Sequence, residues 1–255
     1  MYFYDYQLWI YFFILIRIVG VSFFIPFFST SLLPTPVKIF LVIFVSYICL
    51  PMSTQTMPLN TDALTIVFYL LLNFTVGISI GIITQIVFSA VQFAGDFFGI
   101  QMGFALAEVL NPVYEEEVSL FSELTFLLTT MIFFIFKGHI WLYTLIIESF
   151  KKLPVVFSLN QDVFMVLSQK LGDVMIIGVE FALPITAFML LTNISLGIAS
   201  RLMPQLNVFM IGLPLNIIIG FLIFTVVIYT WEENFTRLFF QIYTWLQNTI
   251  TMFAK

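Results

Sequence analysis

Two long segments of this chain, residues 63–95 and 202–231, contain no acidic or basic side chain. Each is long enough to cross a hydrocarbon layer about 30 Å thick as a helix. Across the 255 residues, only 9% are charged and 61% are hydrophobic, whereas about a quarter of the residues in a soluble domain are charged. Such a chain cannot cover itself with a solvated surface, so we expect an integral membrane protein.

The hydrophobic segments predict an all-α membrane protein of roughly five to seven helices. A lipid-facing sheet would have to close on itself and alternate polar with apolar residues, and this pattern is missing. Residues 63–95 fit one long helix, or two helices that meet near residues 89–95. We expect a polar connector from Lys151 to Asp173 and an amphipathic tail helix over residues 232–255. The other apolar segments are residues 8–28, 37–50, 124–136, 140–147 and 174–200.

Composition gives no support to an enzyme or a nucleic-acid-binding protein. The formal net charge of -5 is spread thinly and forms no basic patch. A single histidine, His139, and a single cysteine, Cys49, provide neither a metal site nor a disulfide framework. No phosphate-binding loop, zinc-protease motif or serine nucleophile elbow is present, so we predict no catalytic residue, no metal and no cofactor. The N-terminus lacks a basic region and a cleavage site, and we expect no removable signal peptide.

Three carboxylates, those of Asp96, Glu108 and Glu180, lie within or beside apolar segments, where charge is costly. They could act as proton or ion sites in a proton-coupled secondary transporter. That alternative predicts two related halves, and no internal repeat is visible. Structural or pore-lining roles are therefore favoured, with Asp96 as a candidate helix N-cap.

A glycine face precedes the strongest break in the apolar pattern. Gly95, Gly99 and Gly103 are spaced by four, and Ala107 continues the series, so on a helix they share one face. Small residues on one face let another helix backbone approach closely. Gly77 and Gly81 repeat the arrangement. Packing within this chain and packing against other subunits both remain open.

The break itself is the sequence EVLNPVYEEEV, residues 108–118. Pro112 disfavours a helical conformation at Asn111 and so ends the helix. The glutamates at positions 115–117 fit a solvated loop, because like charges repel and stay hydrated. They also fit the wall of a passage, since non-helical backbone at membrane depth survives only when buried in protein or beside water.

Three segments, in chain order, resemble the FliR family of flagellar type III export gate proteins, which is related to the SctT family of injectisomes. Residues 94–113 resemble its glycine-rich QMG segment, and residues 137–155 resemble its Gly-His hairpin. Residues 182–220 are the closest match. Within that match, the family motif falls on Arg201, Pro204, Gln205, Asn207, Gly212 and Pro214. The family commonly has Asp-Pro where this chain has Asn111-Pro112, which keeps the turn-forming oxygen and removes a charge.

The resemblance implies a single domain over residues 1–255 that acts as a non-enzymatic structural and gating subunit of a protein-conducting channel. The implied partners are FliP-like and FliQ-like subunits in one complex, FlhB-like and FlhA-like proteins, unfolded export substrates in transit and membrane lipid, with no nucleic acid. The implied location is the bacterial inner membrane, at the flagellar basal body. The homologous gate subunit of a virulence injectisome is the close alternative.

The resemblance also assigns roles to residues. The loop of residues 108–119 would be a plug that closes the channel, and the face of Gly95, Gly99, Gly103 and Ala107 would pack against neighbouring subunits. The hydrophobic helices would form kinked hairpins packed in a helical hetero-oligomeric gate, with kinks at the prolines at 184, 204 and 214. The residues assigned to the plug are Glu108, Val109, Leu110, Asn111, Pro112, Val113, Tyr114, Glu115, Glu116 and Glu117.

Overall fold

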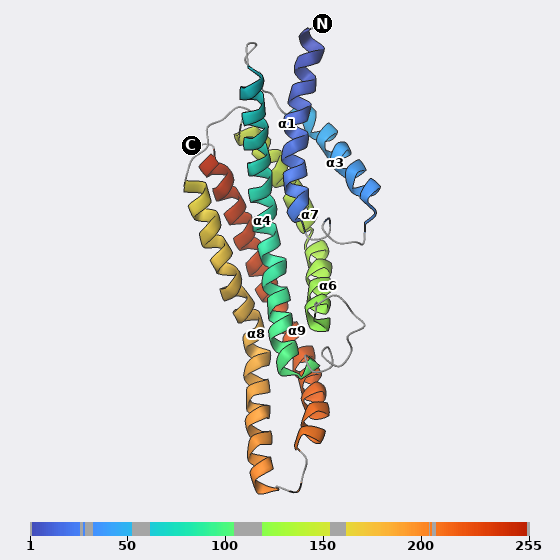
Figure 1. Ribbon diagram of the computed structural model, residues 1–255, viewed down its shortest axis with the longest axis vertical. Helices are drawn as coiled ribbons and strands as arrows, with labels where there is room; N and C mark the ends of the chain where they lie inside the picture. Colours follow the sequence, from blue (N-terminus) through green and yellow to red (C-terminus); the bar gives the residue numbers. More distant parts are fainter. Residues whose placement is uncertain are drawn as a thin grey trace. The chain divides into compact units, whose positions relative to one another are not determined.

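The computed structural model describes residues 2–25, 28, 33–52, 62–104, 119–153, 162–203, 205 and 208–253. Within these residues the secondary structure consists of seven α-helices and one short 3-10 turn, without strands (Figure 1). Four helices are long and apolar enough to cross a membrane, or five segments if the bent pair α6 and α7 counts as one. The prediction of an all-α membrane protein is confirmed. The elements are α1 (Tyr2–Phe24), α3 (Thr35–Cys49), the 3-10 turn η1 (Leu50–Met52), α4 (Ala63–Gln101), α6 (Leu120–Ile135), α7 (Gly138–Lys152), α8 (Asp162–Leu202) and α9 (Val208–Phe253).

Helix α4 decides between the two interpretations of its segment. It runs without interruption from Ala63 to Gln101, so residues 63–95 belong to one helix. No proline interrupts this sequence, and its glycines are used for close packing. Asp96 lies inside the helix and not at its start, so the prediction that it caps a helix N-terminus is wrong.

Helix α8 begins earlier than the sequence pattern suggested. It starts at Asp162, so the polar connector ends before that residue and does not reach Asp173. Ser168 and Gln169 are exposed on the helix surface. The Lys170 ammonium lies 4.2 Å from the centre of the Trp245 ring, a cation–π contact with α9. The polar side chains mark an exposed helix face, which polarity alone does not distinguish from a loop.

Helix α9 continues through Glu232 to Phe253, so residues 232–253 are helical but do not form a separate element. Their pattern is amphipathic, because buried residues recur at intervals of three or four. The expected position of this segment at a membrane surface stays a prediction. Its buried apolar residues are Phe235, Leu238, Phe239, Ile242, Leu246, Ile250 and Phe253.

A bend of 68° separates α6 from α7 at a short break. At this bend Lys137 has a left-handed backbone, with φ 56°. A Cβ atom on Gly138 would collide with the Phe133 ring, so only glycine fits there. The expected break at Lys137-Gly138-His139 is confirmed. Helices α8 and α9 continue through Pro184 and Pro214.

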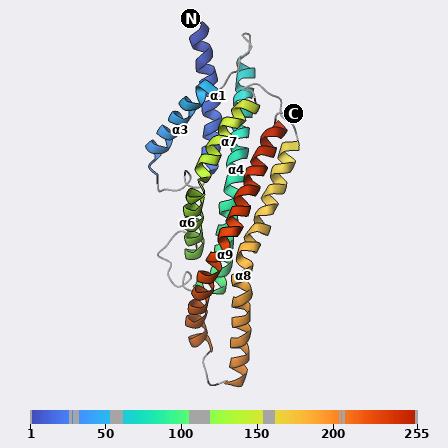
Figure 2. The ribbon, with the colours of Figure 1, turned by 180° about the vertical axis from the view of Figure 1, so that it is seen from behind.

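The chain divides into two compact units. Unit 1 comprises Met1–Ile86, Phe133–Leu171 and Phe239–Lys255, and unit 2 comprises Val87–Ile132 and Gly172–Leu238. In unit 2, the α8 and α9 segments lie side by side as a hairpin (Figures 1 and 2). The Asn216 side-chain amide donates a hydrogen bond of 2.9 Å to the Asn193 side-chain oxygen across this hairpin. The expectation of helical hairpins holds for this pair.

Candidate functional site

The residues assigned to the plug, Glu108 to Glu117, lie outside the described residues, as does Ala107. The structure does describe both ends of this segment, at Phe104 and Ser119. The candidate site is therefore built from the residues that fix these two ends, all of which belong to unit 2.

The QMG sequence forms the end of α4. After Gln101 the Met102 amide donates to the Phe98 carbonyl at 2.9 Å, and the Gly103 amide donates to the Ile100 carbonyl at 3.0 Å. Gly103 has φ +91°, a left-handed backbone that glycine adopts without strain. Such a glycine is a common helix terminator. The chain therefore leaves the helix at Gly103, five residues before Glu108, the first residue assigned to the plug.

Phe104, Phe121 and Phe221 form a cluster that we call the aromatic clasp. The Phe104 and Phe121 ring centres lie 4.9 Å apart in an edge-to-face contact. Phe221 of α9 contacts both rings, at 6.2 Å and 5.5 Å. Phe104 follows α4, and Phe121 lies in the first turn of α6. The clasp therefore brings together the two sides of residues 105–118.

Further aromatic side chains, most of them buried, pack against the aromatic clasp. Phe98 packs against Phe121 at 5.5 Å and against Phe224 at 5.4 Å. Trp231 is fully buried beside Phe224, with ring centres 5.7 Å apart. Sequence analysis missed these residues, because 33 phenylalanines in the chain make any particular one uninformative.

Gly220 brings α9 close to the end of α4. A Cβ atom on Gly220 would lie 2.5 Å from Cγ of Met102, which is completely buried. Leu213 Cδ2 would similarly lie 3.0 Å from a Cβ on Gly103. The QMG turn is therefore packed against α9, so any side chain larger than glycine at position 220 has to displace Met102.

Gly95 and Gly99 face α6 of the same chain. A Cβ on Gly95 would meet the Phe121 carbonyl oxygen at 2.7 Å, and a Cβ on Gly99 would meet Phe121 Cβ at 3.1 Å. Of the two interpretations left open, packing within the chain is therefore observed for these two glycines. Contact of the glycine face with other subunits stays a prediction.

The remaining motif residues do not gather into one site. Gly212 is buried in α9, whereas Arg201, Gln205 and Pro214 are exposed. Pro204 and Asn207 lie outside the described residues. The exposed arginine and glutamine lie at the α8 end and just beyond it, where they are accessible to solvent, lipid or another chain.

The carboxylates considered for proton transfer do not form a cluster among the described residues. Asp96 is half-buried in α4 and Glu180 is exposed on α8, while Glu108 lies outside the description. His139 is exposed, and its ring packs 5.2 Å from that of Phe134. In the described part of the chain, no group of three histidine, cysteine or acidic side chains could hold a metal ion.

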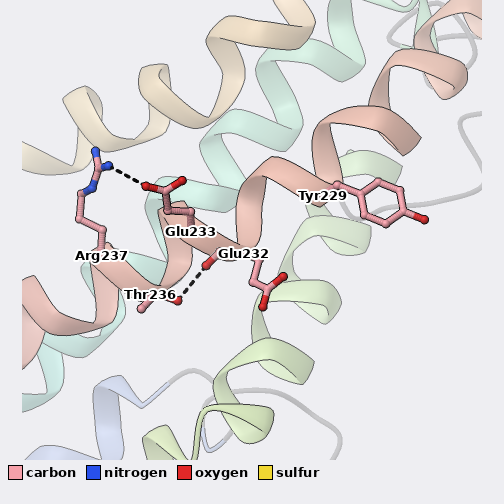
Figure 3. Close-up of a pocket in the computed structure, with 5 residues that line it drawn as sticks. All are labelled: Tyr229, Glu232, Glu233, Thr236 and Arg237. Carbon is pink, nitrogen blue, oxygen red and sulfur yellow. Dashed lines mark hydrogen bonds and ion pairs between the residues drawn. The ribbon is translucent and has the colours of Figure 1, made fainter.

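An open hollow of about 460 Å³ lies along one side of α9. Figure 3 shows its lining, which comes from a single helix. The Arg237 guanidinium is 3.5 Å from the Glu233 carboxylate, and the Thr236 hydroxyl donates to the Glu232 carbonyl at 2.9 Å. These are local contacts within one helix, and they provide no nucleophile paired with a base. The lining residues are Tyr229, Glu232, Glu233, Thr236 and Arg237.

The fold and the site define an all-helical membrane protein whose described polar groups are spread along helices and not assembled for catalysis. The chain belongs to the family described as bacterial export proteins, family 1, whose sequence model matches residues 8–242. The expected resemblance to export proteins is thereby confirmed, and a non-enzymatic role in a membrane agrees with this membership.

Similar proteins from several bacteria carry flagellar names. The chain is 30% identical to the flagellar biosynthetic protein FliR of Escherichia coli (strain K12) over 215 residues, which cover 83% of this chain and 81% of that protein. It is 31% identical to the FliR protein of Aquifex aeolicus (strain VF5) over 211 residues, covering 81% and 80%. The secretion system apparatus protein SsaT of Salmonella typhimurium is 30% identical over 146 residues, 56% of each chain.

Proposed function

We propose that this chain is a structural and gating subunit of the protein-conducting export gate of the bacterial flagellar type III secretion system. The observation that carries the proposal is the similarity to flagellar FliR proteins over about four fifths of both chains. The injectisome alternative has weaker support, because the similarity to the secretion protein SsaT covers just over half of each chain.

The proposal includes a location and a set of partners. The subunit acts in the inner membrane at the flagellar basal body, in one complex with FliP-like and FliQ-like subunits, near FlhB-like and FlhA-like proteins. Unfolded export substrates pass through the complex. Exposed apolar side chains on most of α3 and on the α8–α9 hairpin support a setting in lipid or against other subunits.

Residues 108–119 act as the plug in this proposal, and the domain extends over residues 1–255. The aromatic clasp supports the assignment, because its Phe104 and Phe121 rings hold together the described residues on the two sides of the segment. Gly103, with its positive φ, follows the last turn of α4 five residues before Glu108. The glutamates at 115–117 then face water or a passing polypeptide, where their charges stay hydrated.

A proton-coupled transporter is less consistent with the structure. It needs carboxylates that gather near a shared pathway. Asp96 and Glu180 do not form such a group with other described acids, and Glu180 is exposed.

The test of the plug is deletion of Asn111–Glu117 in the chromosomal gene. The complex is expected to assemble with all subunits, and the membrane to become permeable to small ions, measured as collapse of the membrane potential and as growth inhibition at high salt. A matched control replaces Glu115, Glu116 and Glu117 with glutamine, which keeps the loop length and is expected to keep the membrane tight. A deletion strain with a tight membrane and a complete complex would refute the plug.

The test of the wider proposal is affinity purification from the native membrane in mild detergent, followed by native mass spectrometry. Recovery of FliP-like and FliQ-like subunits with this chain would support an export gate. Recovery of the chain alone or as a simple homodimer, under conditions that preserve other membrane complexes, would contradict it.

A further inference from the structure

A completely buried arginine lies in the middle of an apolar helix. Arg17 of α1 has no exposed surface, and it belongs to unit 1 together with its partners Asn73, Ser149 and Phe150. Buried polar groups are costly unless they are hydrogen-bonded, and cationic groups inside membrane segments mark specific contacts. No role discussed above uses this side chain.

The guanidinium group is held by residues from two other helices. Its Nε and Nη2 atoms donate to the Asn73 side-chain oxygen on α4, at 3.0 Å and 2.6 Å. Its Nη1 atom donates to the Ser149 hydroxyl on α7 at 3.4 Å. Its Cζ atom lies 4.4 Å from the centre of the Phe150 ring, at cation–π distance. Asn73 and Ser149 are themselves completely buried.

Local hydrogen bonds orient both acceptors toward the arginine. The Asn73 side-chain nitrogen donates to the Tyr69 carbonyl at 2.8 Å, which leaves the amide oxygen facing Arg17. The Ser149 hydroxyl donates to the Ile146 carbonyl at 2.7 Å, so its oxygen is available to accept from Nη1. Each acceptor is therefore oriented by a hydrogen bond within its own helix, independently of α1.

Around this cluster the α1 and α4 backbones touch. A Cβ on Gly77 would collide with the Arg17 carbonyl oxygen, and a Cβ on Gly20 would lie 2.7 Å from the Phe74 carbonyl oxygen. A slide of one helical turn, about 5.4 Å, would take the guanidinium away from Asn73. In one direction it would bring Gly81 to the position of Gly77, so the glycines alone do not exclude the shifted alignment. Apolar side chains tolerate many arrangements, whereas this donor–acceptor set fits one.

We propose that Arg17, Asn73 and Ser149 form a buried polar lock that sets the register of α1 against α4 and α7, with Arg17 as the positioning residue. The lock acts on helix alignment more than on total stability. Removing one partner leaves buried donors or acceptors without hydrogen bonds, which is destabilising. Replacing both partners with apolar residues of similar size removes the buried polar groups that require hydrogen bonds. The proposal does not depend on the flagellar assignment.

The experiment measures helix register by cysteine cross-linking of the full chain in membranes, in a Cys49→Ala background. The Phe23 and Phe74 rings lie 6.4 Å apart, so the pair Phe23→Cys/Phe74→Cys reports the native alignment of α1 and α4. The pair Phe23→Cys/Leu70→Cys reports an alignment shifted by about one turn. With Arg17 present, we expect the native pair to cross-link at least about tenfold faster than the shifted pair, since a turn changes the separation by about 5 Å.

The decisive variant is the double replacement Arg17→Met/Asn73→Leu, which keeps apolar bulk at both positions. We expect it to accumulate near the wild-type level but to lose most of its preference for the native cross-link. The single variants Arg17→Met and Asn73→Leu are expected to accumulate poorly, because each leaves a buried polar partner. A double variant that retains the full cross-linking preference would overturn the proposal.

Two further variants keep the test informative if the double variant does not accumulate. Asn73→Asp offers the guanidinium a charged acceptor and is expected to keep the native preference, whereas Arg17→Lys lacks the planar fork and is expected to reduce it. Equal preferences in these two variants would overturn the proposal. Ser79→Ala is the matched control, because that buried hydroxyl bonds only to the Thr75 carbonyl of its own helix.

Discussion

Two helix contacts in this molecule depend on glycine, and they differ in what the glycines meet. Between α1 and α4, a Cβ on Gly77 would strike the Arg17 main chain. Between α4 and α6, a Cβ on Gly99 would meet side-chain atoms, Phe121 Cβ at 3.1 Å and the Ser119 hydroxyl at 3.3 Å. At Gly77 a larger side chain requires the movement of a helix, whereas at Gly99 the contacts of 3.1 Å and 3.3 Å have to open by only a few tenths of an ångström. Gly95, one turn before Gly99 in the same α4–α6 contact, resembles Gly77, because a Cβ there would lie 2.7 Å from the Phe121 carbonyl oxygen. The tolerance is therefore specific to Gly99, which is nearer in sequence to the proposed plug.

The strongest test of this difference is Gly77→Leu. The side chain has no space against the backbone of α1, so we expect a loss of more than about 4 kcal/mol and little folded protein. The measurement is the yield of monodisperse protein after detergent extraction. Gly197→Leu is the control, since nothing lies within 4 Å of a Cβ at Gly197. Wild-type yield for Gly77→Leu would show that the two contacts do not differ as described.

Gly99→Leu should be less damaging to the chain itself. The neighbouring side chains can shift, at a cost of about 1–3 kcal/mol. Because the glycine face is also proposed to meet other subunits, we expect the variant to accumulate but to be missing from the assembled complex. Gly99→Ala is expected to assemble, because its Cβ displaces the neighbouring atoms by only a few tenths of an ångström. Purification of Gly99→Leu in a complete complex would contradict the packing argument.

Phe104→Ala tests the aromatic clasp, and its expected effect is smaller again. The ring pair with Phe121 contributes about 0.5–1.5 kcal/mol beyond its buried area. We expect a folded protein, a complete complex and an ion leak that is weaker than that of the Asn111–Glu117 deletion. Phe104→Tyr keeps the ring and should keep the membrane tight. If the alanine variant keeps the membrane impermeable to ions, the aromatic clasp does not contribute to gating.

The smallest effect is expected at the exposed ion pair of Arg237 and Glu233. Their side chains are 68% and 83% exposed, and such pairs contribute at most about 1 kcal/mol. Arg237→Gln should therefore leave the apparent melting temperature in detergent almost unchanged. A loss of stability comparable to that of Asn73→Leu would mean that this exposed ion pair contributes as much to stability as the buried hydrogen bonds of Arg17.

The sequence predicted the helices well where charge and proline are absent. The uncharged run of residues 63–95 became the centre of α4, and Lys137-Gly138-His139 marked the bend of 68°. Helix starts within polar sequence were missed. Asp162 begins α8 because the exposed face of a helix tolerates Gln169 and Lys170 as well as a loop does.

The polar interior could not be predicted from local patterns. Arg17 was visible only as an interruption of an apolar stretch. Its acceptors lie 56 and 132 residues further along the chain, and their hydrogen bonds arise only after three helices have packed. The clasp was hidden for a related reason, since Phe104 and Phe121 stand out only when α4 and α6 bring their rings together. The glycine spacing, in contrast, correctly indicated close approach, but not whether side chain or backbone would fill the gap.

The contact between Phe104 and Phe121 in the aromatic clasp affects how the length of the intervening segment can vary. When the two ends of a connection are already fixed together, doubling its length costs only about 0.6 kcal/mol of closure entropy. Insertions and deletions between these rings thus leave the packing of α4 and α6 nearly untouched. Natural selection, or an engineer who grafts a sensor peptide there, can vary what occupies the segment while the surrounding helices keep their arrangement.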